Sequence, residues 1–211
     1  MSRTATRILI ARHGQTVSNK EGRFCGHSET ELTALGIEQA RALGRRLAAV
    51  PIQAAYTSDF GRAIQTAGYA LGERGITPRT DPDLRELHYG EWELEKEREI
   101  ARRFPHQHRL MRDEDPAWQP PGGETIDMVR ARTGAALLRI AKAHAHQTVL
   151  VVTHGTAINC MLAGVLGMPA SHTFRFDVAN CGLSEVVMRR ATPVVVTLND
   201  VSHLTALGSG S

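Results

Sequence analysis

Residues 7–14 read R-I-L-I-A-R-H-G, and residues 148–155 read T-V-L-V-V-T-H-G. Each is a short apolar run that predicts a buried strand and ends in a His-Gly pair. Because ligands bind beyond the carboxyl ends of the strands in an open α/β sheet, we expect His13 and His154 to face one pocket. Arg12, beside the first histidine, indicates that this pocket takes an anion.

The rest of the chain supplies further strands and helices. The expected elements are a helix capped by Thr33, a strand over 52–57, a helix capped by Ser58 or Asp59, a helix over about 126–145, a helix over 157–166, and strands over 173–177, 183–188 and 193–198. Alternating strands and helices imply right-handed crossovers, whereas the last three strands follow one another without helices. We therefore predict a three-layer α/β/α sandwich with helices on both faces of a mostly parallel sheet and an antiparallel edge strand.

Residues 81–123 depart from this alternation, because they are rich in charge and proline. They include E-L-E-K-E-R-E-I-A-R-R-F, which indicates either a solvated helix with internal ion pairs or a cap over the pocket. No linker of domain length interrupts the sequence. We expect a single domain over residues 1–207, with 81–123 as a cap-like excursion and 208–211 as a flexible tail.

Two further charged side chains are candidates for the pocket. Arg62 lies in the first turn of the helix after strand 52–57, where its charge opposes the helix dipole, so a functional role is as plausible as a structural one. Glu86 is the candidate general acid, and its alternative is a surface carboxylate paired with Arg85 or another basic residue. Glu91 and Glu93 compete with it. For His13, the alternative is a core histidine bonded to a backbone carbonyl.

Five motifs resemble the histidine phosphatase superfamily, the phosphoglycerate mutase-like enzymes, over nearly the whole chain. They are R-H-G-Q-T-V-S-N (12–19), S-D-F-G-R-A-I-Q-T-A (58–67), L-R-E-L-H-Y-G-E-W-E (84–93), G-G-E-T (122–125) and V-V-T-H-G-T (151–156). The short chain resembles the phosphatase branch, in particular α-ribazole, broad-specificity and metal-independent phosphoserine phosphatases. One departure is Leu94, because phosphatases of this family often carry glycine after Trp-Glu.

The resemblance implies a role for each matching residue. His13 would be the nucleophile, Glu86 the acid, Arg12, Arg62 and His154 the catalytic phosphate pocket, and Asn19, Gly155, Cys25 and Gly26 further phosphate or substrate contacts. Additional substrate contacts are expected around Cys25–His27 and from Tyr89, Trp92 or basic residues between Arg103 and Arg112.

The implied activity is a metal-independent phosphomonoesterase that hydrolyses small phosphate monoesters through a phosphohistidine on His13. The alternative within the family is a cofactor-dependent phosphoglycerate mutase. A non-enzymatic alternative is an inactive module that binds phospho-ligands, which is disfavoured because every catalytic position holds a competent residue. No cofactor is expected.

Composition restricts the partners and excludes other chemistries. The net charge of +3 is spread over both halves and aromatic residues make up only 5%, which disfavours nucleic-acid binding. No apolar stretch is long enough for a membrane span, and three cysteines without CxxC spacing favour the cytoplasm. The sequence has no Cys-x5-Arg and no P-loop, and the pairs His106/His108 and His144/His146 lack the ligands to complete a metal site. The expected partner is a small phosphorylated metabolite, with a homodimer left open.

Overall fold

The computed structural model describes residues 5–190 and 192–207, and six strands form one sheet in the order β3-β2-β4-β1-β5-β6. The strands are β1 (Thr6–Arg12), β2 (Ala54–Thr57), β3 (Arg79–Thr80), β4 (Thr148–Thr153), β5 (Leu183–Arg189) and β6 (Thr192–Asp200). The pairs among β3, β2, β4 and β1 are parallel, whereas β5 is antiparallel to both β1 and β6. This confirms the predicted mostly parallel sheet with an antiparallel edge.

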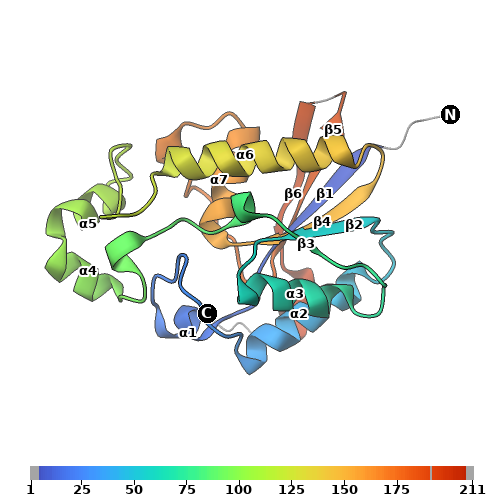
Figure 1. The fold of residues 1–211 in the computed structure, drawn as a ribbon, viewed down its shortest axis with the longest axis horizontal. Coiled ribbons are helices and arrows are strands. Elements are labelled where there is room, and N and C mark those ends of the chain that lie inside the picture. Colours follow the sequence, from blue (N-terminus) through green and yellow to red (C-terminus); the bar gives the residue numbers. More distant parts are fainter. Residues whose placement is uncertain (1–4, 191, 208–211) are drawn as a thin grey trace.

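Helices cover both faces of the sheet (Figure 1). They are α1 (Val17–Glu21), α2 (Ala34–Leu47), α3 (Gly61–Leu71), α4 (Glu97–Arg103), α5 (Pro105–Arg112), α6 (Ile126–Ala143) and α7 (Gly155–Val165). Alternate residues of β1 separate the two layers, since Leu9 packs in the cluster with α2 and α3 while Ile8 and Ile10 pack with α6 and α7. The three-layer sandwich is confirmed.

Helix α6 shows how the local sequence sets these elements. The Thr125 side chain accepts a hydrogen bond from the Met128 amide and so caps the helix. Residues at helical spacing on one face are buried, among them Ile126, Val129 and Ile140. Of the described helices, none is both long and apolar enough to cross a membrane.

Two predictions of local structure are wrong. Residues 173–177 form turns and bends instead of a strand, and Phe174 and Phe176 line a cavity there in place of a sheet face. Helix α3 has Phe60 at its N-cap with no side-chain cap, because Ser58 bonds to a histidine and Asp59 to Arg85. The predicted tail at 208–211 lies outside the described residues.

Residues 81–123 pack around an apolar cluster that they share with α6 and α7. Leu87, Trp92 and Trp118 pack there with Ile100 of α4, so this charged helix is anchored by one buried side chain. Leu94 adopts a φ of 62°, a left-handed conformation that glycine takes without strain. Glycine would therefore suit this position.

Candidate active site

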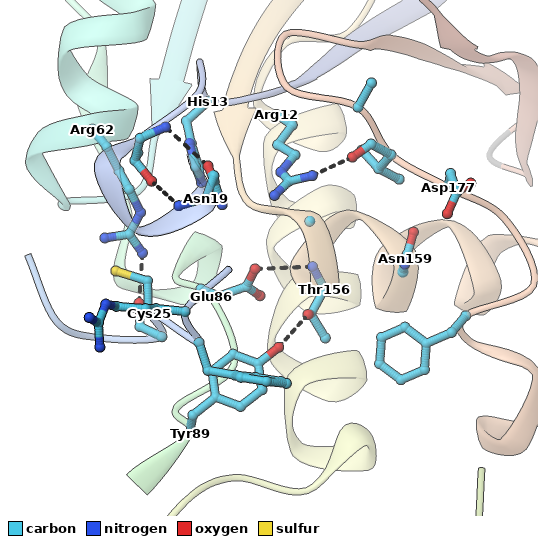
Figure 2. Close-up of a pocket in the computed structure, with 18 of the residues that line it drawn as sticks. Arg12, His13, Asn19, Cys25, Arg62, Glu86, Tyr89, Thr156, Asn159 and Asp177 are labelled. Atoms are coloured by element: carbon cyan, nitrogen blue, oxygen red, sulfur yellow. Dashed lines mark hydrogen bonds between the residues drawn. The ribbon is translucent and has the colours of Figure 1, made fainter. Parts of the chain in front are cut away.

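The strand ends bring the two predicted histidines together. Arg12 at the end of β1 is in register with Thr153 at the end of β4, so the residues that follow lie side by side. The ring centroids of His13 and His154 are 5.1 Å apart. Arg12, His13 and Arg62 line a cavity of about 550 Å³, shown in Figure 2.

His13 is held with one ring nitrogen facing the backbone. Its Nδ1 lies 2.7 Å from the Gly14 carbonyl oxygen, so Nδ1 carries the proton and donates it to that oxygen. Nε2 therefore keeps its lone pair. Burial, together with the charges of Arg62 and Arg12, lowers the pKa of His13 well below 6.5, and the ring is neutral. The carbonyl bond expected of a core histidine is present, and it leaves Nε2, with its lone pair, without a hydrogen to donate.

Arg12 is half-buried against the start of α7. Its Nη1 donates to the Val178 carbonyl at 2.6 Å, while its Nε is buried without a partner. A Cβ on Gly155 would lie 3.4 Å from that Nε, so glycine lets the guanidinium approach the helix backbone. Gly14 is needed for a similar reason, because a Cβ there would collide with the Gly36 carbonyl.

Arg62 is only 1% exposed. Its two terminal nitrogens donate to the carbonyls of Gly26 (2.6 Å) and Ser28 (2.9 Å), and its guanidinium lies 4.8 Å from the Phe60 ring centroid. Its Nε is also buried without a partner. A buried cation held mainly by neutral carbonyls is costly, and an entering anion would offset that cost.

His154 is fully buried beside His13 and does not line the cavity itself. Its Nε2 lies 2.6 Å from Ser58 Oγ, and its Nδ1 has no partner. Burial is the main cause of its pKa lying well below 6.5, with smaller contributions from Arg62 and His13. Ser58, which the sequence analysis treated only as a helix cap, therefore orients this ring.

Asn19 also lines the cavity, as do Cys25 and Gly26. The Asn19 Oδ1 accepts from the Thr16 amide (3.1 Å) and from Asn180 Nδ2 (3.2 Å), which leaves its own amide nitrogen for a ligand. Asn180 was missed by the sequence analysis. It also donates to the His13 carbonyl at 3.0 Å and so ties the two motifs together.

Glu86 lies at the amino end of α7. Its Oε1 accepts from the amides of Leu87 (2.8 Å) and Ala157 (3.1 Å), and its Oε2 accepts from the Thr156 amide (3.1 Å). Of the three competing carboxylates Glu86 alone lines the cavity. Glu91 is exposed outside it, and Glu93 accepts from the His27 amide behind it.

The alternative interpretation of Glu86, a surface carboxylate paired with Arg85, does not hold, because Arg85 pairs with Asp59. Tyr89 lines the cavity, and its hydroxyl lies 3.1 Å from Thr156 Oγ1. Other expected substrate contacts are wrong. Trp92 is fully buried in the cluster of residues 81–123, and the basic residues from Arg103 to Arg112 lie outside the cavity.

The histidine pairs considered as metal sites have other contacts. His108 pairs with Glu97, and His144 bonds to Tyr56 and Gln147. Within residues 5–190 and 192–207, no three His, Cys, Asp or Glu side chains are grouped so as to hold a metal ion.

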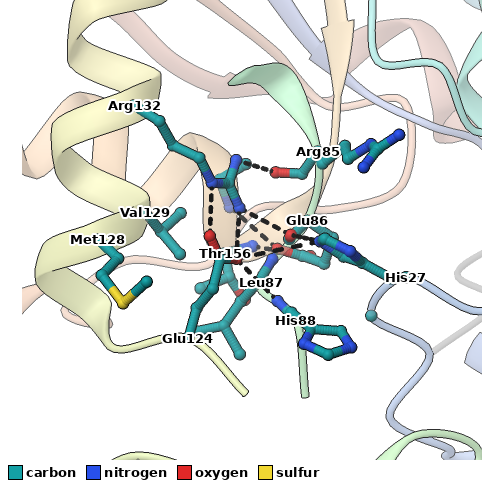
Figure 3. A network of polar contacts seen from close by, with 12 residues as sticks. His27, Arg85, Glu86, Leu87, His88, Glu124, Met128, Val129, Arg132 and Thr156 are labelled. Atoms are coloured by element: carbon teal, nitrogen blue, oxygen red, sulfur yellow. Dashed lines mark hydrogen bonds and ion pairs between the residues drawn. The ribbon is translucent and has the colours of Figure 1, made fainter. Parts of the chain in front are cut away.

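The backbone that carries Glu86 is fixed from α6 by Arg132 (Figure 3). Arg132 donates to the carbonyls of Asp83 (3.0 Å), Arg85 (2.6 Å) and Glu86 (2.8 Å), and pairs with Glu124 at 2.8 Å. The side chain of Arg132 is only 16% exposed, so these bonds lie mostly out of water. Arg132 therefore positions the carboxylate through the main chain.

Replacing Arg132 by methionine is expected to lower the free energy of unfolding by about 3 kcal/mol, because the carbonyls and Glu124 lose their buried partner. Urea unfolding measures this change. Arg139→Met is the control, since Arg139 lies on the same helix and bridges Asp81 and Asp83 at 51% exposure. It should cost no more than about 1 kcal/mol. Equal losses of unfolding free energy in the two variants would contradict the role of Arg132 in holding the backbone around Glu86.

The lowered pKa values of His13 and His154 predict how stability depends on pH. Below about pH 6.5 the unfolded imidazoles take up protons that the folded ones do not bind, so each should reduce the free energy of unfolding by about 1.4 kcal/mol per pH unit. The stabilisation is fully present above pH 6.5.

Urea unfolding between about pH 7.5 and 5 checks this dependence. The double variant His13→Asn/His154→Asn should lose most of the slope, whereas His106→Asn, at an exposed histidine, should keep it. An unchanged slope in the double variant would show that these rings are not buried in the neutral form.

Comparison with known proteins places this geometry in a family. A family model described as "Histidine phosphatase superfamily (branch 1)" matches residues 8–201. The "Probable phosphoglycerate mutase GpmB" of Proteus mirabilis (strain HI4320) is 34% identical over 206 residues, which cover 94% of each chain. The "Adenosylcobalamin/alpha-ribazole phosphatase" of Escherichia coli (strain K12) is 31% identical over 175 residues, covering 82% of this chain and 85% of that protein.

The solved structures agree. The structure titled "Bacillus stearothermophilus YhfR" superposes with a TM-score of 0.91 at 33% identity and covers 95% of this chain and 100% of that one. Since the family model matches nearly the whole sequence, the chain belongs to the histidine phosphatase superfamily (branch 1).

Proposed function

We propose that this protein hydrolyses small phosphate monoesters, without a metal ion, through a phosphohistidine on His13. The observation that carries the proposal is the meeting of a neutral His13 with two guanidinium groups, those of the half-buried Arg12 and the buried Arg62, in the cavity that Glu86 also lines. The E. coli relative is named as a phosphatase, which supports the same reaction.

In the first step, the lone pair of His13 Nε2 attacks phosphorus in line with the ester oxygen. The N–P bond forms and the P–O bond to the alcohol breaks. Arg12, Arg62 and the Asn19 amide stabilise the charge on the equatorial oxygens, a role that metal ions fill in other phosphoryl-transfer enzymes, while His154 packs beside the His13 ring and supports it from behind the cavity. Glu86 gives its proton to the departing alkoxide.

In the second step, water attacks the phosphohistidine. The Glu86 carboxylate takes a proton from this water, the P–O bond forms, and the P–N bond breaks to release phosphate and regenerate His13. Because one carboxyl group serves both steps, its position beside the leaving oxygen is essential.

The unpaired thiols of Cys25, Cys160 and Cys181 support a reducing cytoplasm as the compartment.

The test is to trap the intermediate. Rapid quenching with alkali during turnover of a ³²P-labelled ester in EDTA should leave label on a peptide containing His13, and that label should be released by acid. Absence of label from the native protein during turnover, or hydrolysis that stops in EDTA, would overturn the proposal.

A mutase is the second candidate, because the P. mirabilis relative is named as a probable phosphoglycerate mutase. A mutase returns the phosphoryl group to the substrate and excludes water. Incubation with 3-phosphoglycerate therefore separates the two: free phosphate supports the phosphatase, and 2-phosphoglycerate supports the mutase.

A further inference from the structure

The cavity extends well beyond the phosphate-binding end. The rest of its wall includes two polar side chains, Asn159 of α7 and Asp177, and the aromatic rings of Phe24, Tyr89, Phe174 and Phe176. No step of the proposed reaction uses this end. Its chemistry therefore bears on which alcohol the substrate carries.

Helix α7 leads from the reacting atoms to these residues. The leaving oxygen must lie beside Glu86, which is bonded to the Thr156 amide. Asn159 lies three residues after Thr156, on the same face of the helix, and both line the cavity. Asn159 lies four positions after Gly155, the first residue of α7, which corresponds to about 6 Å along the helix axis. A group two or three bonds beyond the ester oxygen would reach this position.

Asn159 presents an acceptor that has no donor. The residue is 8% exposed, and its Oδ1 is buried without a hydrogen-bond partner. In Figure 2 this oxygen is directed to the side of the cavity where Asp177 lies. A buried acceptor without a partner is costly, and a ligand that donates an N–H would remove that cost.

Asp177 adds an unpaired negative charge. It is exposed at the cavity, and no cation or donor of the described chain pairs with it. The cations nearby are already bound, since Arg23 donates to Glu21 (2.6 Å) and to the Leu94 carbonyl, and Arg175 pairs with Glu114 (2.8 Å). The free charge at this end of the cavity is therefore negative.

We propose that Asn159 and Asp177 bind an ammonium group, and that the preferred substrates are phosphate monoesters of amino alcohols. This inference rests on the proposed phosphatase activity. An ammonium group donates N–H bonds to both acceptors, and aromatic rings favour a cation beside their faces. A carboxylate in the same place would meet the like charge of Asp177 and would leave the Asn159 Oδ1 unpaired, so the site discriminates against it.

Three esters of similar size test the charge preference. They are 2-aminoethyl phosphate, 2-hydroxyethyl phosphate and phosphoglycolate, which carry a positive, a neutral and a negative group. We expect kcat/KM to fall in that order, with roughly 10- to 100-fold between the first and the last, the value of charge-assisted hydrogen bonds. Equal values, or a preference for phosphoglycolate, would overturn the inference.

Variants assign the preference to the two residues. In Asp177→Asn the amino-to-carboxylate ratio of kcat/KM should fall towards one. The control Glu73→Gln removes the same charge from an exposed residue outside this cavity and should keep the ratio. Asn159→Leu should lower the amino-to-hydroxyl ratio while its melting temperature stays at or above that of the native protein, because an unpaired buried acceptor is removed. A preference that survives in Asp177→Asn would contradict the assignment.

Binding of inert analogues separates this inference from the phosphatase itself. The phosphonates 3-aminopropylphosphonate and 3-phosphonopropionate cannot be hydrolysed, and calorimetry should show the amine binding at least about tenfold more tightly. If no ester is hydrolysed but the amine still binds more tightly, the proposed function fails and the ammonium site stands. If p-nitrophenyl phosphate is hydrolysed through His13 but neither assay shows a charge preference, the ammonium site fails alone.

Discussion

Replacing His13 by alanine is expected to lower kcat for p-nitrophenyl phosphate by at least about 10⁴-fold, because no other group can form the covalent intermediate. The Nε2 lone pair is lost, whereas Arg12, Arg62 and Glu86 remain to bind the ester. KM should therefore change much less than kcat. Steady-state kinetics in the presence of EDTA measure both constants.

The control for this variant is His106→Ala. His106 is exposed on α5 and lies outside the cavity, so kcat should stay within about twofold of the native value. Activity in His13→Ala within tenfold of the native protein would remove His13 as the nucleophile. A melting temperature for each variant establishes that a loss of kcat does not come from unfolding.

The sequence was sufficient to place the candidate site residues together because the topology of the sheet largely determines their positions. Parallel strands end at one edge of a sheet, so Arg12, His13 and His154 were expected at that edge, and the pairing of β1 with β4 in the structure brings them side by side. Arg62 followed from the same rule at the end of β2. The roles expected for these residues came from the family resemblance. The residue types alone were equally consistent with a core histidine at His13 and a surface carboxylate at Glu86.

The residues that orient this cluster were not predicted. Ser58 directly follows β2 and so lies at the same edge as Arg62, a signal that was available but was interpreted as a helix cap. Asn180 gave no such signal, because it lies in the turn before β5 and its position depends on how that strand pairs with β1. Side-chain bonds between distant segments have no periodic pattern in the sequence.

The error at 173–177 has a physical cause. A run rich in β-branched and aromatic residues has the usual pattern of a strand. The pattern indicates that apolar side chains are partly buried, but it does not indicate whether they pack in a sheet or elsewhere. Here Phe174 and Phe176 line the cavity. Ligand-facing and sheet-facing aromatic residues look alike in a sequence, so only the structure could separate them.

Replacing Glu86 by glutamine should affect two classes of ester differently. An alkyl phosphate needs a proton on its departing oxygen, so the rate of phosphorylation should fall about 10²- to 10⁴-fold. The p-nitrophenolate ion leaves without a proton, so phosphorylation by p-nitrophenyl phosphate should fall less than about tenfold. Stopped-flow absorbance for p-nitrophenol and quenched-flow assays for the alkyl ester measure these rates.

The second half of the reaction sharpens this test. Water still needs a base, so the phosphohistidine should accumulate in Glu86→Gln, and p-nitrophenol should appear as a burst of about one equivalent followed by slow turnover. Glu91→Gln is the matched control, since this exposed carboxylate of the same segment lies outside the cavity and should show neither effect. Equal losses for both esters with no burst would show that Glu86 neither gives nor takes the proton. The two amide bonds from Thr156 and Ala157 that hold Glu86 at α7 would then have only a structural role, fixing residues 81–123 against this helix.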